Sequence, residues 1–499
     1  MAGHPPISVG FTEHRSRCRF AVEMGSPTRA TLRGSCDAAA FPSGAWPRSL
    51  PSSGLASPQQ LLHVKLLACK VTTRAMQRVL LITLCFGLLL VPVFALRAAE
   101  APAGQVSITS DFPGGNIVVE RIEGDDVYVH QDLRDTKGDW FYWYFAVRGA
   151  QGRELTFHFT QSNAVGLLGP GISRDSGLTW SWLGQADSPT SFRYKFAADE
   201  SDVRFSVGMP YQHADLLRFL QKHKDDAHLR TEVLGKTKLG TPVELLRLGK
   251  LEGAPDFRVL VTVRHHACEM MASYVAEGLM EELLAPSETG AWLREHVQCA
   301  VVPMVDKDGV EKGDQGKNRW PHDHKADYRG QSIYPEVAAL REFVTNWSNG
   351  RPDVTLDLHN PTLSGRVIYT HALRGTTGRT ADEIAAILAN SDAMRFLKAL
   401  EEVQTGPLRF RVQDSLDFAA RIARVRPDSE VEERQQNVAA ASRPAGARAG
   451  PISVGFEIPY ALVGETEVTP VSAGAFGHDI ARALAAYLKA SHGLARGQP

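Results

Sequence analysis

The stretch that most constrains the fold of this chain is RVLVTVRHHACE, residues 258–269. It begins with an apolar run rich in β-branched residues, which is typical of a buried strand in a parallel sheet. It ends with His266 and Glu269. Ligands of open α/β sheets bind just beyond the carboxyl ends of the strands, so these side chains are expected at a site of chemistry. The i, i+3 spacing lets both face one point, where they would offer two ligands to a metal such as zinc.

Two other apolar segments end in a similar way. The segment DVTLDLH ends at His359, and the segment ISVGFE ends at Glu457. A buried imidazole or carboxylate at the end of a strand is costly unless it is paired or bound to a metal. Three such strand ends therefore predict a site at one edge of a sheet. The alternative is that these polar side chains simply reach solvent.

The chain from residue 209 onward alternates between predicted strands and predicted helices, among them one long helix over residues 380–403. Alternation of this kind predicts an α/β fold, with a mostly parallel sheet and helices on both of its faces. We therefore expect one α/β catalytic domain over residues 209–495.

Residues 104–208 show a different pattern. Short runs of β-branched and aromatic residues, such as WFYWYFAV at 140–147, alternate with segments that contain Gly, Asp or Pro. This spacing is typical of a β-sandwich. The aromatic residues favour the core of such a domain over a carbohydrate-binding surface, because aromatic residues are enriched in strands generally. No catalytic motif is found in this segment.

Residues 76–103 contain a candidate export signal. Met76 and Arg78 precede an apolar run, and Val93-x-Ala95 offers a cleavage site, as in a secretory signal peptide. We therefore expect an exported protein, periplasmic or secreted. Residues 1–75 are rich in Ser, Pro, Arg and Ala, and we interpret them as a disordered or wrongly assigned extension. The alternative is a membrane anchor formed by residues 79–96, which is just long enough to span a bilayer.

The composition sets broad limits on function. The chain has 499 residues, of which 43% are hydrophobic, and a net charge of -1, as expected of a globular protein with two or three domains. Without a basic excess or a basic run, nucleic acid is not expected as a partner. A membrane is expected to contact the chain only through the signal or anchor segment.

Taken in order, His266-x-x-Glu269, His359 and Glu457 on a late strand resemble the zinc metallocarboxypeptidases. The resemblance is strongest to the cytosolic-carboxypeptidase-like branch and its bacterial relatives, which also carry an N-terminal β-sandwich. It covers roughly residues 110–490. It implies a carboxypeptidase-like fold and a zinc hydrolase that removes residues from the C-terminus of a peptide or protein.

The resemblance also implies a role for each site residue. His266, Glu269 and His359 would bind one zinc ion per chain. Glu457 would be the general base that takes a proton from water and passes it to the leaving amine. Arg319 would contact the substrate and stabilise the tetrahedral oxyanion.

One departure from the family concerns the recognition of the substrate's terminal carboxylate. Where the family places Asn-Arg, this chain has Lys325-Ala326. A guanidinium binds a carboxylate in a bidentate fork, whereas Lys325 would act as a point charge. Two alternatives follow. The first is a zinc amidase that acts on peptidoglycan-like or N-acyl amino-acid amides, and the second is a catalytically weak binding protein that retains the fold.

Overall fold

The computed structural model describes residues 105–184, 186–372, 380–425 and 451–495. All of them lie in one compact unit, Leu96–Pro499. The predicted N-terminal extension, export signal and anchor segment lie outside the described residues. Among the residues that are described, no helix combines the length and the apolar character needed to cross a membrane.

Two sheets make up the N-terminal β region, which we define as Ser107–Ser206. One sheet has the strand order β1-β4-β9-β6-β7, and the other has the order β2-β3-β5-β8. The bounds are β1 (Ser107–Thr109), β2 (Val118–Glu123), β3 (Asp126–His130), β4 (Tyr144–Arg148), β5 (Glu154–Phe159), β6 (Gly171–Ser173), β7 (Ser181–Trp182), β8 (Ser191–Lys195) and β9 (Asp202–Ser206).

Aromatic side chains connect these two sheets. Phe145 of β4 and Phe205 of β9 each contact Phe157 of β5, with ring centroids 5.5 Å apart. Trp143 is fully buried, and its indole N–H donates to the carbonyl of Ala164. Burying one large apolar side chain contributes about 1.5–3 kcal/mol, so these aromatic residues are well placed to hold the region together. The β-sandwich organisation and the domain limit at residue 208 stay predictions.

A seven-stranded sheet lies at the centre of the α/β region, with the order β10-β11-β13-β12-β14-β16-β15. Its four inner strands β13, β12, β14 and β16 run parallel. The outer strands β10, β11 and β15 pair antiparallel. The bounds are β10 (Leu229–Lys236), β11 (Pro242–Gly249), β12 (Phe257–Val263), β13 (Val297–Val302), β14 (Val354–His359), β15 (Tyr369–Thr370) and β16 (Ile452–Glu457).

The sheet is therefore mixed, whereas the alternation of elements predicted a mostly parallel one. The short connection between β10 and β11 explains part of the difference, because a short turn can join only antiparallel neighbours. The small hairpin β17 (Leu462–Val463) and β18 (Thr466–Glu467) follows the sheet.

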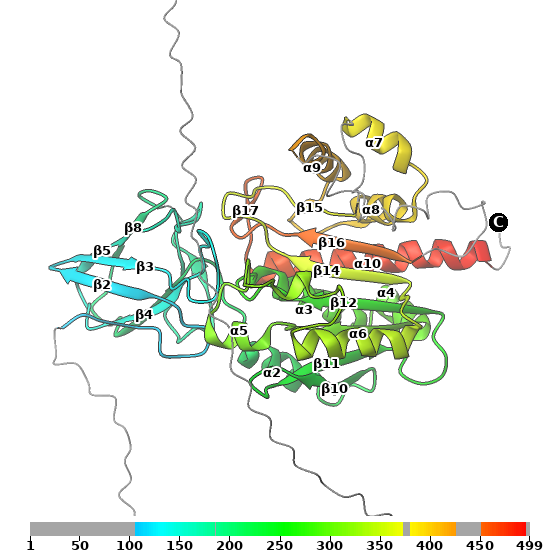
Figure 1. Ribbon diagram of the computed structural model, residues 1–499, viewed down its shortest axis with the longest axis horizontal. Helices are drawn as coiled ribbons and strands as arrows, with labels where there is room; N and C mark the ends of the chain where they lie inside the picture. The colour runs from blue at the N-terminus through cyan, green and yellow to red at the C-terminus, as the bar shows by residue number, and fades with distance from the viewer. Residues whose placement is uncertain (1–104, 185, 373–379, 426–450, 496–499) are drawn as a thin grey trace, which may run out of the picture. The chain divides into compact units, whose positions relative to one another are not determined.

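Helices cover both faces of this sheet (Figure 1). Along β12, Val259, Val261 and Val263 belong to the main core, which includes residues of α3 and α10. The intervening Leu260 packs in a second cluster with residues of α6. The helices are α2 (His213–Lys222), α3 (Met271–Leu284), α4 (Glu288–His296), α5 (Lys307–Lys312), η1 (His324–Ala326), α6 (Pro335–Ser348), α7 (Ala381–Leu388), α8 (Asp392–Val403), α9 (Val412–Val425) and α10 (Pro470–Ala495).

The single helix predicted over residues 380–403 is instead two helices, α7 and α8. The hydroxyl of Ser391 accepts a hydrogen bond from the Met394 N–H and thereby caps the start of α8. Ser and Asp favour such helix starts, because their short side chains satisfy N–H groups that have no partner within the helix. The Ser391-Asp392 pair was the sequence signal for this break.

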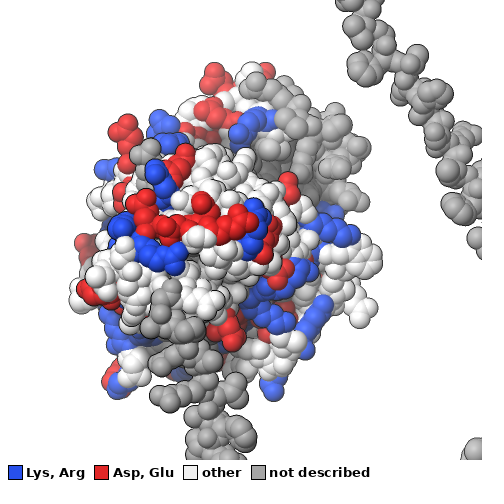
Figure 2. Space-filling view, turned by 90° about the vertical axis from the view of Figure 1, so that its left-hand side faces the viewer, with Lys and Arg blue, Asp and Glu red and all other residues white. Residues whose placement is uncertain are grey.

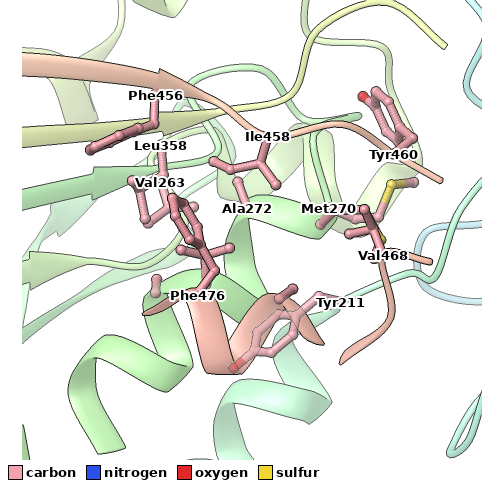
Figure 3. Close-up of a cluster of buried hydrophobic side chains, with 14 of the residues drawn as sticks. Tyr211, Val263, Met270, Ala272, Leu358, Phe456, Ile458, Tyr460, Val468 and Phe476 are labelled. Carbon is pink, nitrogen blue, oxygen red and sulfur yellow. The ribbon is translucent and has the colours of Figure 1, made fainter. Parts of the chain in front are cut away.

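A buried apolar cluster lies beneath the ends of the inner strands (Figure 3). Val263 of β12, Leu358 of β14 and Phe456 of β16 are all fully buried, and Ile458 and Phe476 pack among them. Side chains alternate between the two faces of a strand, so His359 and Glu457, which follow Leu358 and Phe456, point away from the cluster. Packing of the apolar residues thus presents the polar strand ends on the other side.

Charges of both signs are mixed on the face drawn in Figure 2, where acidic and basic side chains stand next to one another. In the N-terminal β region, for example, Arg121 pairs with Glu123 and Arg153 pairs with Asp125. Exposed pairs of this kind contribute at most about 1 kcal/mol each.

Candidate active site

Three side chains lie together at the carboxyl ends of β12 and β14. Nδ1 of His266 is 3.0 Å from Oε1 of Glu269, and Nδ1 of His359 is 2.7 Å from Oε2 of the same carboxylate. One ligand atom from each residue lies within 4.8 Å of the other two. Two imidazole nitrogens and one carboxylate are a donor set of catalytic zinc sites, so this group fits the metal expected from the sequence.

A carboxylate lies behind each of the two histidines. Nε2 of His359 is 2.8 Å from Oδ2 of Asp357, and Nε2 of His266 is 3.7 Å from Oδ2 of Asp323. Asp357 also accepts a hydrogen bond from the Thr262 hydroxyl at 2.8 Å. Such carboxylates fix the orientation of an imidazole and keep its other nitrogen available to a metal. The sequence analysis did not identify Asp323.

The Glu269 carboxylate is completely buried and carries its charge there. Burial opposes ionisation, but the neighbouring His266, Lys317 and His359 side chains hold the pKa of Glu269 well below its ordinary value. Burial also lowers the pKa of His266. A metal ligand must be a carboxylate or a neutral imidazole, so both shifts favour the forms that bind metal.

The turn that carries His266 and Glu269 is held by Arg264. Its backbone has φ 60, a left-handed conformation that non-glycine residues rarely adopt. Its buried guanidinium donates to the carbonyl of Ala267 at 3.0 Å and to that of Tyr211 at 2.8 Å. These contacts stabilise a strained turn directly beside the site, where such strain is often found. Sequence reasoning missed this role of Arg264.

Glu457 ends β16, opposite His359 in the register of β14 and β16. Its Oε1 lies 2.9 Å from Nε2 of His371. Its other oxygen is buried and has no hydrogen-bond partner in the part of the chain that the structure describes. Burial opposes ionisation of Glu457, but the hydrogen bond with His371 and the charge of His359 bring its pKa below the ordinary value. The site therefore contains an ionised carboxylate with one uncommitted oxygen.

Arg319 lies outside this group and is surrounded by acidic residues. Its Nε is 2.9 Å from Asp135, its Nη1 is 2.6 Å from Asp306, and its Nη2 is 3.0 Å from Asp314. Burial alone would lower its pKa, but the three carboxylates raise it. The structure thus commits each nitrogen of Arg319 to a carboxylate of this chain.

Lys325 approaches the site through Asp357. Its ammonium contacts Oδ2 of Asp357, the oxygen that also lies next to His359. Almost half of the Lys325 side chain is exposed. The neighbouring Ala326 has no charged group. The structure therefore brings Lys325 close to the candidate metal ligands but gives its ammonium an internal partner.

A family model described as zinc carboxypeptidase matches residues 215–347. The resemblance to the zinc metallocarboxypeptidases is confirmed. Within the matched segment lie His266, Glu269, Arg319 and Lys325. His359 and Glu457 lie beyond it, and strand pairing from β12 through β14 to β16 brings them to the same edge of the sheet.

Curated relatives of this family match the chain at modest identity. Mouse cytosolic carboxypeptidase 1 is 25% identical over 243 residues, which cover 43% of this chain and 19% of that protein. Human cytosolic carboxypeptidase 6 is 25% identical, over 34% of this chain and 35% of that protein. An uncharacterised protein of Zymomonas mobilis is 25% identical, over 42% of this chain and 55% of its own length. The chain thus spans about half or less of these relatives.

Solved bacterial metallocarboxypeptidases share the fold over more of the chain. The Burkholderia cenocepacia enzyme aligns with a TM-score of 0.58 at 17% identity, covering 77% of this chain and 99% of that chain. The Pseudomonas aeruginosa enzyme, solved with (2-guanidinoethylmercapto)succinic acid, aligns with a TM-score of 0.57 at 20% identity, covering 77% and 100%. The fold of this chain is therefore the carboxypeptidase-like α/β fold, with a mixed sheet and helices.

One further cation belongs to this candidate site, and the sequence analysis did not single it out. Lys317 places its ammonium 2.7 Å from Oε1 of Glu269. The preceding Gly316 has φ +76, and a Cβ there would lie 2.2 Å from the backbone nitrogen of Ala267. Only glycine allows so close an approach. The sequence signal was therefore Gly316, whose close contact with the turn at Ala267 places the following lysine next to Glu269.

Proposed function

We propose that this protein is a zinc-dependent metallocarboxypeptidase that hydrolyses the C-terminal peptide bond of peptides or proteins. The convergence of His266, Glu269 and His359, with Glu457 on the adjacent strand, carries this proposal. Zinc in such a site lowers the pKa of a water molecule and polarises a carbonyl. The remaining steps fall to the residues of the chain.

Glu457 is the proposed general base. Its low pKa keeps the carboxylate ionised, and one of its oxygens has no hydrogen-bond partner among the described residues. The carboxylate takes a proton from the attacking water as the water oxygen bonds to the carbonyl carbon. It then delivers that proton to the amine nitrogen as the C–N bond breaks. His371 holds one oxygen of Glu457 and thereby orients the base.

Lys325 is the proposed contact for the substrate's terminal carboxylate. Its ammonium lies at the Asp357 carboxylate, close to His359, and part of the side chain reaches solvent. A substrate carboxylate there would have to share this ammonium with Asp357. We therefore expect weaker recognition of a terminal carboxylate than an arginine would give.

Arg319 remains a proposed substrate contact, but its surroundings favour a structural role. Its three carboxylate partners come from the N-terminal β region and from both sides of α5. Moving the guanidinium to a substrate would take a cationic partner away from three carboxylates, of which Asp306 is almost fully buried, and this is costly.

The export and the domain organisation of the enzyme are likewise proposed from sequence patterns. Residues 76–103 would direct export, and the 104–208 β-sandwich would precede the 209–495 catalytic domain. Neither proposal is needed for the chemistry at the metal-binding group.

A zinc amidase is the second candidate function. Two observations favour it: Ala326 stands where a carboxylate-binding arginine would be expected, and the Lys325 ammonium already has Asp357 as a partner. Such an enzyme would hydrolyse an amide without needing a free carboxylate beside it.

The two functions can be separated with one purified protein. We would measure zinc content and then compare the hydrolysis of peptides that end in a free acid with that of their C-terminal amides. Release of residues only from free acids supports the carboxypeptidase, and equal cleavage of both supports the amidase. A chelator should abolish either activity, and added zinc should restore it. Activity that survives complete removal of the metal would contradict both.

A further inference from the structure

Lys317 lies at the centre of the charged groups of the site. Its ammonium is 2.7 Å from Glu269 and 3.4 Å from the carbonyl oxygen of Asn360, the residue after His359. The charge of Glu457 also acts on it. The ammonium therefore lies against the proposed metal ligand, at the sheet edge where β14 and β16 bring His359 and Glu457 together.

The hydrogen-bonding capacity of Lys317 is only partly used. An ammonium has three N–H donors, and among the described residues it has two oxygen acceptors, Glu269 and Asn360. The side chain is 11% exposed, so its charge is largely shielded from water. Arg319, two residues further along the loop, has each of its nitrogens paired with a carboxylate.

We propose that Lys317 supplies the positive charge that stabilises the tetrahedral oxyanion, and that Trp140 of the N-terminal β region holds it in place. This rests on the proposed hydrolase function. When the water oxygen bonds to the carbonyl carbon, the π electrons of the carbonyl move onto its oxygen. Lys317 donates a hydrogen bond to that oxygen, and the charge returns when the C–N bond breaks. A preorganised donor in a buried site stabilises such a charge far more than water does.

Trp140 is a positioning residue in this arrangement. The Lys317 ammonium lies 4.6 Å from the centroid of the Trp140 ring, a distance at which a cation and an aromatic face attract each other. Asp135 of the same region accepts hydrogen bonds from the backbone N–H groups of Gln315 and Gly316. The N-terminal β region thus holds both the side chain and the backbone of the Lys317 loop.

The first test compares Lys317→Met with Lys317→Arg in the zinc-loaded protein. Loss of one oxyanion donor typically costs about 100-fold to 1,000-fold in kcat, so we expect that loss in Lys317→Met with little change in KM. Lys317→Arg keeps a cation and should recover part of the rate. Lys307→Met is a matched control, because Lys307 is another buried lysine paired with a carboxylate, Glu244, outside the site.

The second test measures binding rather than turnover. A phosphinate peptide mimics the tetrahedral state, and calorimetry gives its affinity for the zinc-loaded protein. Lys317→Met should weaken phosphinate binding by about the same factor as kcat, whereas binding of the hydrolysis product should change little. Zinc content, measured in parallel, should stay at the wild-type level.

Trp140 is tested with a conservative and a disruptive variant. Trp140→Phe keeps an aromatic face, and Trp140→Leu removes it. We expect Trp140→Leu to lower kcat about tenfold with KM nearly unchanged, and Trp140→Phe to restore most of it. If Trp140 acted only in folding, Trp140→Leu would lower the melting temperature but would not lower kcat at a nearly unchanged KM.

The outcomes separate this proposal from the proposed function. If the wild type cleaves its substrate and Lys317→Met matches it in kcat and in phosphinate affinity, the role of Lys317 is wrong while the function stands. If Lys317→Met loses zinc, the lysine balances the charge of Glu269 and is no oxyanion donor. If the wild type binds zinc but hydrolyses neither peptides nor amides, both proposals fail.

Discussion

His359 and Glu457 occupy opposite positions in the parallel pair β14 and β16. One is a proposed metal ligand and the other the proposed base, so the spacing of neighbouring strands, about 4.8 Å, sets how far apart they can be. Leu358 and Phe456, the residues just before them, are buried in one apolar cluster. A slip of one residue would bury the polar pair and expose the apolar one, so core packing holds the register of the site.

The first prediction concerns the metal. Purified protein should hold about one zinc ion per chain, because three ligands with an open fourth position bind zinc tightly. Replacing His266, Glu269 or His359 with Ala should remove it, as measured by elemental analysis after dialysis. His322→Ala is the control, since His322 pairs with Asp327 on a nearby loop. Full zinc retention in all three ligand variants would place the metal elsewhere.

The second prediction concerns Glu457. Glu457→Gln keeps the shape of the side chain but cannot accept a proton. It should retain zinc and lose roughly two or more orders of magnitude in kcat. Glu467→Gln, at the exposed end of β18, is the matched control and should keep the wild-type rate. An unchanged rate in Glu457→Gln would assign the base to another residue.

The third prediction concerns pH. The hydrogen bond with His371 helps to lower the pKa of Glu457, so His371→Ala should raise that pKa. The active form of a base is its ionised form. The acid limb of the profile of kcat/KM against pH should therefore move to higher pH in His371→Ala. His478→Ala removes a comparable histidine–carboxylate pair, with Glu282, away from the site and should leave the profile in place. A shift to lower pH, or no shift, would rule out this coupling.

The fourth prediction concerns Lys325 and Ala326. If Lys325 meets the terminal carboxylate, Lys325→Ala should raise KM for free-acid peptides and leave KM for the corresponding amides unchanged. Replacing both residues, Lys325→Asn with Ala326→Arg, should improve release of terminal residues, because a guanidinium binds a carboxylate through two hydrogen bonds.

The fourth prediction needs two controls. Zinc content must be measured as well, because Lys325 contacts the Asp357 carboxylate that lies against His359. Lys224→Ala, an exposed lysine paired with Asp225, is the control for a general effect of charge. Strong cleavage of free acids by Lys325→Ala would show that another residue binds the carboxylate.

Much of the site could be predicted from the sequence because its signals are local. The apolar run before His266, and those that end at His359 and Glu457, follow from the composition of single strands. Carboxyl ends of parallel neighbours meet at one edge, so the three endings were expected together before any contact was known. The i, i+3 spacing within the turn is likewise a property of one short segment.

The features of the site that only the tertiary structure decided depend on contacts between distant segments. The family resemblance assigned Arg319 to the substrate, but its guanidinium pairs with Asp135, which is 184 positions away, and with the nearer Asp306 and Asp314. Lys317 lies at the site because Gly316 packs against the turn after β12. His371 lies next to Glu457 because β15 pairs with β16. The hydrophobic periodicity of a sequence indicates on which face of a strand or helix a side chain lies. The partners of that side chain are set by how separate elements pack. That is why strand ends were predictable from this sequence and the charge network around them was not.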